Sequence, residues 1–144
     1  MVMVCVGACS DFDPVVTARI SGGDGAAPSA TVNGCTANMY ADRTSPSADR
    51  TVGFGGDHGS TGFTFAPKCI AITAGQDVTF SGAFATHPLS AGLAGGSPGG
   101  SPGNPIPGTA TGTSVTVRFP VAGVYPFTCT MHGLLGMNGA VLVR

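Results

Sequence analysis

Glycine and proline are so frequent in this chain that they exclude most helical folds. There are 24 glycines and 11 prolines among the 144 residues, and both residue types destabilise the interior of a helix. Charged residues make up only 9%, whereas a helical bundle needs many charged side chains on its surface. Hydrophobic residues make up 42%, which is enough to build a core and argues against disorder throughout. The composition therefore predicts one small all-β domain.

Short apolar segments between turn residues predict the strands. Apolar and polar residues alternate with a period of two, which is typical of strands with one buried face. Many short strands joined by Gly/Pro turns indicate a sandwich, and we predict a Greek-key β-sandwich. The expected strand positions are Phe63 and Phe65; 70–73; Val78, Phe80 and Phe84; Val115, Val117 and Phe119; Tyr125, Phe127 and Cys129; and 141–143.

A long stretch rich in glycine, serine and proline covers residues 90–113. Loops beyond about 12–15 residues are usually functional or disordered. We expect the low-complexity part, residues 95–103, to be mobile. Ile106 is the one large apolar residue after Leu93 in this stretch, so the segment around it is expected to pack.

The N-terminal residues are apolar and resemble a bacterial lipoprotein signal that is truncated. Val6-Gly7-Ala8-Cys9 is similar to a lipobox, in which the cysteine is acylated. The basic residues that normally begin such a signal are missing, so a chance apolar start is the alternative. We expect a signal segment at 1–9 with Cys9 as the lipidation candidate, a flexible tether at 10–30 and the folded domain at 31–144. The protein would then be exported, either periplasmic or anchored to the membrane through Cys9.

The cysteine count is consistent with an exported domain. Beyond Cys5 and Cys9 there are three cysteines, at positions 35, 69 and 129. An odd number in an exported domain suggests one disulfide and one special thiol. Cys35 and Cys69 have no histidine nearby in the sequence, so we predict a disulfide between them, with two buried thiols as the alternative.

Charge is scarce and unevenly distributed. The formal net charge is −1, which gives no support to nucleic-acid binding. Between residues 78 and 143 the one charged side chain is Arg118. Most of the predicted β domain therefore has almost no electrostatic field of its own.

Four side chains suited to a soft metal ion stand out. Cys129, His132 and Met137 have the spacing C-x2-H-x4-M, and His87 lies at the end of an earlier predicted strand. Two imidazoles and a thiolate with a weak thioether are the ligands of blue-copper sites. Zinc is the first alternative, but methionine is a poor zinc ligand and no second cysteine pair is available.

These residues allow two further interpretations. A cysteine hydrolase would need an acidic residue to orient His132, and this region contains none. Met137 could be an ordinary core residue, although glycines flank its segment. The remaining histidine, His58, lies among glycines and is expected to be a solvated loop residue.

The region around these ligands resembles the cupredoxin family, in particular its plastocyanin-like and pseudoazurin-like members. The matching residues are His87 and the run Tyr-Pro-Phe-Thr-Cys-Thr-Met-His-Gly-Leu-Leu-Gly-Met at 125–137, entered through Gly-Val-Tyr at 123–125. The resemblance covers about residues 60–144. It implies one type 1 copper per chain, and a one-electron carrier between redox protein partners rather than an enzyme. Storage or delivery of copper is the alternative function.

The resemblance also suggests how a partner docks and how the thiolate is supported. Many relatives have asparagine after the first histidine, where this chain has Pro88, which cannot donate a backbone hydrogen bond. We therefore expect the Met131 N–H to point at the Cys129 sulfur. We also expect an apolar docking surface, and a protein that is monomeric. The docking residues would be Pro88, Leu89, Gly133, Leu134 and Leu135.

Overall fold

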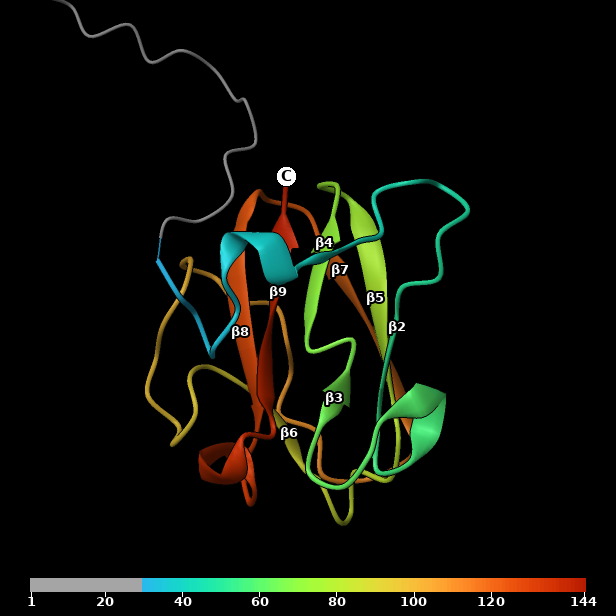
Figure 1. Cartoon of the computed structure of the whole chain (residues 1–144), viewed down its shortest axis with the longest axis vertical. Helices are drawn as coiled ribbons and strands as arrows, with labels where there is room; N and C mark the ends of the chain where they lie inside the picture. The colour runs from blue at the N-terminus through green and yellow to red at the C-terminus, as the bar shows by residue number, and fades with distance from the viewer. Residues whose placement is uncertain (1–29) are drawn as a thin grey trace, which may run out of the picture.

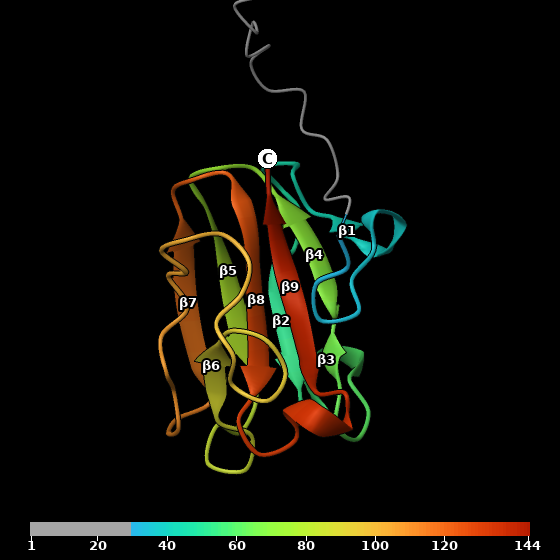
Figure 2. The same cartoon turned by 90° about the vertical axis from the view of Figure 1, so that its left-hand side faces the viewer.

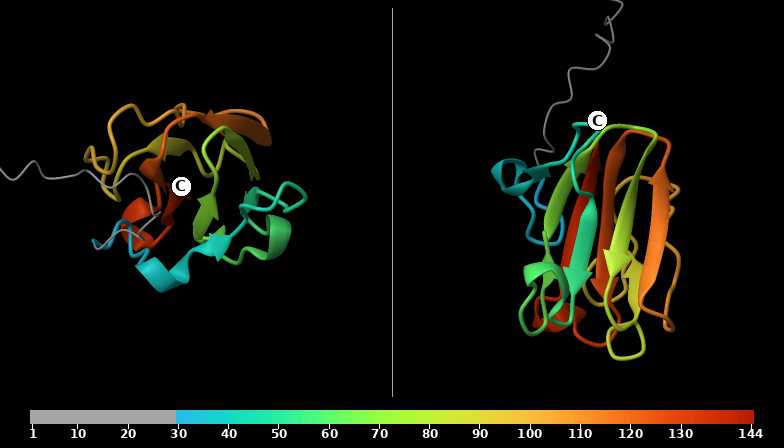
Figure 3. Two further views of the ribbon diagram at one scale, coloured as in Figure 1. Left: turned by 90° about the horizontal axis from the view of Figure 1, so that it is seen from above. Right: turned by 90° about the vertical axis from the view of Figure 1, so that its right-hand side faces the viewer.

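The computed structural model describes residues 30–144. The sequence predictions that fall on residues 1–29, including the signal-like segment and Cys9, lie outside the described residues. Two mixed β-sheets pack face to face as a sandwich, so the predicted fold class is confirmed (Figure 1, Figure 3). No helix of the described part is long and apolar enough to cross a membrane.

The two sheets contain nine strands in the described residues. One sheet has the order β1 (Ala41–Asp42), β4 (Cys69–Ile72), β9 (Asn138–Val143), β8 (Gly123–Cys129), β6 (Leu89–Ala91). The other has the order β3 (Phe65–Ala66), β2 (Thr51–Phe54), β5 (Gln76–Ser81), β7 (Ser114–Phe119). Three short 3-10 helices connect them: η1 (Ala37–Met39), η2 (Asp57–Gly59) and η3 (Gly133–Leu135).

The hydrophobic core lies between the sheets. Buried and more exposed residues alternate along β7, as the sequence predicted for a strand with one face in the core. Five phenylalanines are fully buried, and burial of each stabilises the fold by about 1.5–3 kcal/mol. They are Phe54, Phe80, Phe84, Phe119 and Phe127.

Strands β4 and β9 are buried on both faces. Their inner side chains, such as Ile70 and Val141, belong to the core between the sheets. Their outer side chains, such as Leu142, pack with Cys35 and Tyr40 in a second apolar cluster. The segment before β1 therefore covers the outer face of these strands (Figure 1), which is why neither strand alternates in the sequence.

The sequence analysis missed strands β2 and β6. Gly53 interrupts the apolar pattern of β2, and parallel pairing with β5 holds this strand in the sheet. Strand β6 falls inside the stretch that was predicted to be loop. It exists because Leu89, Ser90 and Ala91 pair with the C-terminal half of β8.

Two further residues of that glycine-rich stretch form backbone hydrogen bonds to β8, so the stretch lies against this strand (Figure 2). The Gly92 N–H donates to the Pro126 carbonyl at 2.9 Å, and the Ser101 N–H donates to the Val124 carbonyl at 2.7 Å. Ser101 lies within residues 95–103, for which mobility stays a prediction, and this bond attaches it to β8. The expected packing around Ile106 is confirmed, because this side chain is buried in the core.

Candidate metal centre

The four predicted ligands come from two connections at one end of the sandwich. Cys129 is the last residue of β8, and Met137 immediately precedes β9. His132 lies between them, and the αL conformation of Gly136 ends the short helix η3 that follows it. His87 belongs to the turn that leads into β6, and Leu89 of β6 pairs directly with Cys129. The sandwich thus carries His87 to the loop that holds the other three.

Three of the four side chains converge in the structure. The two Nδ1 atoms of His87 and His132 are 3.2 Å apart, and Cys129 Sγ lies 3.6 Å from His132 Nδ1. One ligand atom from each residue lies within 4.8 Å of the others. Ligands bound to one ion at about 2.0–2.3 Å are themselves roughly 3–4 Å apart, so this donor set fits a single bound ion. Met137 is fully buried next to Cys129 in the core cluster.

The surroundings favour a neutral, metal-binding His87. Burial lowers the pKa of this imidazole, and the neighbouring His132 lowers it further because two positive rings would repel each other. Cys129 is buried and is the one free cysteine of the described residues. A buried thiol beside imidazole nitrogens is the soft donor that copper prefers.

Backbone hydrogen bonds hold the ligand connections together. The Cys129 N–H donates to the Met137 carbonyl at 2.9 Å, and the Met137 N–H donates to the His132 carbonyl at 3.2 Å. Although Pro88 cannot donate, its carbonyl accepts from the Thr130 N–H at 2.9 Å and so ties the two connections together. Main-chain hydrogen bonds therefore brace the site even though Pro88 lacks an N–H.

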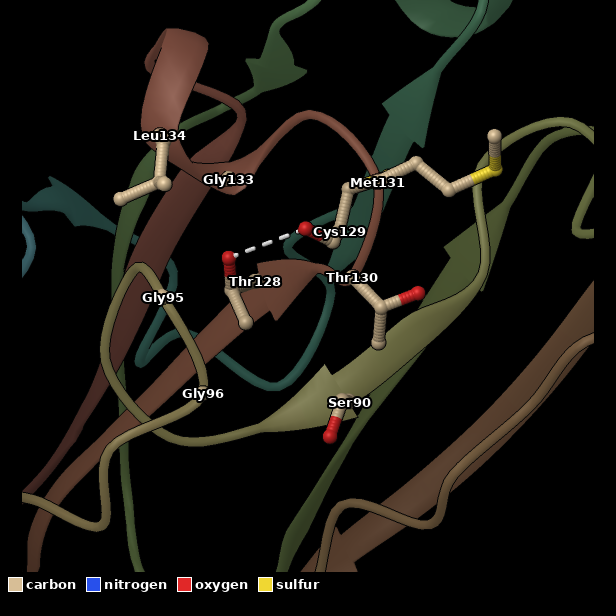
Figure 4. Close-up of a pocket in the computed structure, with 9 residues that line it drawn as sticks. All are labelled: Ser90, Gly95, Gly96, Thr128, Cys129, Thr130, Met131, Gly133 and Leu134. Carbon is tan, nitrogen blue, oxygen red and sulfur yellow. Dashed lines mark hydrogen bonds between the residues drawn. The ribbon is translucent and has the colours of Figure 1, made fainter.

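Side chains of β8 and β9 brace the same loop from within. The hydroxyl of Thr128 donates to the Cys129 carbonyl at 3.3 Å (Figure 4). The Asn138 amide donates to the Gly133 carbonyl at 2.8 Å and is buried. Buried groups that are satisfied in this way fix the loop in one conformation.

Phe63 is a site residue that the sequence analysis did not identify. Its ring stacks on His132 with centroids 4.1 Å apart and an interplanar angle of 13°, and it meets His87 edge-on at 6.1 Å. The sequence predicted it as a strand position together with Phe65, whereas it lies outside β3 and is 46% exposed. It comes from the segment before β3, and no local spacing links it to the histidines.

The expected docking residues divide into exposed and buried ones. Leu134 and Leu135 are 82% and 68% exposed. The prediction is wrong for Leu89 and Gly133, which are buried. Leu89 points into the core because strand β6, missed in the sequence, pairs it with Cys129, and Pro88 is partly exposed.

Met131 lies next to the site with an exposed side chain. Among the described residues, the hydrogen-bond partner of the Cys129 sulfur is His132 Nδ1, and the expected bond from the Met131 N–H is not formed. The preceding Thr130 N–H donates to the Pro88 carbonyl.

The remaining predicted residues fall where expected. Cys35 and Cys69 form a disulfide with their Cα atoms 5.7 Å apart. His58 is exposed in η2 and is not part of the ligand cluster.

Several solved structures are similar to part of this chain. Among solved structures, a mutant plastocyanin of fern is 25% identical over 65% of this chain and 99% of its own, with a TM-score of 0.48. Pseudoazurin from Methylobacterium extorquens AM1 is 26% identical over 65% and 72%, with a TM-score of 0.48. Amicyanin from Paracoccus versutus is 21% identical over 69% and 85%, with a TM-score of 0.45. The comparison with curated proteins gave no match.

The family assignment rests on a sequence model that spans most of the described domain. The model for copper binding proteins of the plastocyanin/azurin family matches residues 51–144. This range includes His87 and the whole segment from Cys129 to Met137. The copper cofactor implied by the donor set is thus the one that the family binds. The chain belongs to the plastocyanin/azurin family of copper binding proteins.

Proposed function

We propose that this protein is a one-electron carrier with a single type 1 copper, which His87, Cys129 and His132 would hold and to which Met137 would add a weaker thioether ligand. The observation that carries the proposal is the convergence of two imidazole nitrogens and one thiol sulfur within 4.8 Å. When bound, copper supplies the Cu(I)/Cu(II) couple. The chain belongs to a family of copper binding proteins, and in our proposal it turns over no substrate.

Each ligand has a distinct role in the proposal. Cys129 would supply the soft thiolate and the electronic connection to the metal, and the two histidines would supply imidazole nitrogens. Met137 is fully buried, so its thioether is held away from water. Both β8 and β9 are fixed in the sheet, and a rigid frame lets one ligand set serve both oxidation states. Such a site exchanges electrons with little rearrangement.

The partner is expected to meet an apolar surface beside His132. Phe63, Met131, Leu134 and Leu135 are all more than two-fifths exposed and belong to the site or its loop. Apolar side chains gathered in this way usually mark an interface. Because the loop carries no charged residue, we propose short-lived apolar contacts with redox protein partners.

The decisive test is the visible spectrum after addition of Cu(II) to the purified protein. A carrier gives an intense band from the Cys129-to-copper charge transfer, whereas a copper storage or delivery protein holding Cu(I) does not. Cys129→Ser should abolish this band because oxygen cannot replace the soft thiolate. Met137→Gln should keep copper and lower the reduction potential.

His58→Ala is the matched control, since it removes an exposed histidine that lies outside the cluster. It should leave both the band and the potential unchanged. A Cys129→Ser variant that remains blue would overturn the ligand assignment.

We also propose that the protein works outside the cytoplasm, with Cys9 as the anchor. The disulfide between Cys35 and Cys69 supports this location because disulfides persist in oxidising compartments. Mass spectrometry of the protein from membranes of the producing cell would detect an acylated Cys9. An unmodified N-terminus that begins before Cys9 would contradict the anchor.

A further inference from the structure

A tight turn at Val32–Cys35 precedes the part of the chain that matches the family. Val32 and Cys35 exchange two backbone hydrogen bonds, of 3.2 and 2.8 Å. Between them Asn33 and Gly34 have φ values of 49° and 77°, which is the pattern of a type I′ turn and suits an Asn-Gly pair. The disulfide to Cys69 then fastens the turn to β4. The turn is therefore rigid and covalently attached to the sheet.

The side chain of Asn33 forms a hub of hydrogen bonds on the outer surface of that sheet. Its Nδ2 donates to the carbonyls of Phe127 and Gly139, both at 2.9 Å, and approaches the Gly92 carbonyl at 3.2 Å. Its Oδ1 accepts from the Ala94 N–H at 3.0 Å. One amide thus connects β8, β9 and the start of the glycine-rich loop, although these lie 59 to 106 residues away in sequence.

The position of this hub relates directly to the ligands. Phe127 and Gly139 face each other in the β8–β9 pair. Phe127 lies two residues before Cys129, and Gly139 lies two residues after Met137. The Asn33 amide therefore bridges the two strands close to the points where they enter and leave the ligand loop.

We propose that Asn33 is a positioning residue for the metal centre, which clamps together the strands that carry Cys129 and Met137. The clamp rests on the proposed function only in so far as those residues bind copper. Its turn lies outside the residues 51–144 that match the family, so the device belongs to the additional N-terminal segment of this chain.

The chemistry of the amide explains why asparagine is suited to this place. Two N–H donors on one rigid group can serve carbonyls of two strands at once, while the oxygen accepts from the loop. Asparagine also tolerates the positive φ that the turn requires. The disulfide at Cys35, two residues later, already holds the turn against the sheet. Forming the amide's hydrogen bonds therefore costs little additional conformational entropy of the chain.

Two substitutions separate the clamp from the turn. Asn33→Gly keeps the positive φ and removes the amide. Asn33→Asp keeps the turn and the acceptor for Ala94, but replaces the donors by an oxygen that faces carbonyl oxygens. The full chain is first studied without copper, by amide hydrogen exchange. Because both variants lose the amide's hydrogen bonds to the carbonyls of Phe127 and Gly139, the Cys129 N–H should exchange about tenfold faster in both.

The copper-loaded protein provides the second readout. A loosened ligand loop should release copper about tenfold faster to a chelator, with a changed ratio of the visible charge-transfer bands. Asn104→Ala is the matched control, because its amide also bonds a β8 carbonyl, that of Pro126 at 2.8 Å, yet it reaches no residue of β9. This variant should leave Cys129 exchange and copper release unchanged.

Hydrogen exchange without copper tests the Asn33 clamp, and the visible spectrum with copper tests the proposed function. Unchanged Cys129 exchange in a folded Asn33→Asp or Asn33→Gly protein would overturn the clamp. So would exchange that accelerates equally in the β5–β7 pair, since that indicates general destabilisation. If the wild-type protein failed to become blue, the proposed function would fail, and the exchange data would still decide whether Asn33 holds the two strands.

Discussion

The stack of Phe63 on His132 allows a quantitative test of the site without any metal. The rings are nearly parallel, with centroids 4.1 Å apart, and Phe63 is 46% exposed. Aromatic pairs contribute about 0.5–1.5 kcal/mol beyond the area they bury. Because the pair is partly open to water, we expect a coupling free energy of about 1 kcal/mol.

The measurement is a double-mutant cycle with Phe63→Leu and His132→Ala. Leucine keeps most of the apolar contact and removes the stacking, so the cycle isolates the interaction between the rings. Urea denaturation of the copper-free wild type, both single variants and the double variant gives the four free energies of unfolding. Working without copper prevents the loss of a ligand from dominating the result.

A second cycle supplies the control. Phe63→Leu combined with His58→Ala should be additive within about 0.3–0.5 kcal/mol, because His58 is exposed in η2 and does not stack on Phe63. A coupling between Phe63 and His132 no larger than this scatter would refute the reasoning. The orientation of His132 would then depend on its loop alone.

Two other predictions concern the docking surface and the disulfide. Leu134→Asp and Leu135→Asp should slow bimolecular electron transfer, while the wild-type rate changes less than about twofold between low and high salt; electrostatically steered pairs change by tenfold or more. A steep salt dependence, or leucine variants as fast as wild type, would exclude an uncharged apolar docking surface. Replacing both Cys35 and Cys69 by serine should lower the free energy of unfolding by about 3–4 kcal/mol, because the disulfide spans 34 residues. Thermal denaturation measures this loss, and an unchanged stability would show that the covering segment holds without the bond.

The sequence alone identified the candidate ligands and the class of fold. Cys129, His132 and Met137 lie within nine residues, so their spacing is a local property that survives any arrangement of the rest. In strands with one buried face, such as β7, apolar and polar residues alternate in the sequence because the other face contacts solvent. The abundance of glycine and proline argued against helical folds, and the net charge gave no support to nucleic-acid binding, both without reference to a structure.

The tertiary structure decided what depends on distant contacts. Strand β9 is buried on both faces because the segment from residue 30 covers it, and no periodicity records that covering. Leu89 is a core residue because β6 pairs with β8. Phe63 reached His132, and Asn33 reached Phe127 and Gly139, only through folding. Local patterns report which residues can bind a metal, but the partners that orient them are brought together by packing between segments far apart in the chain.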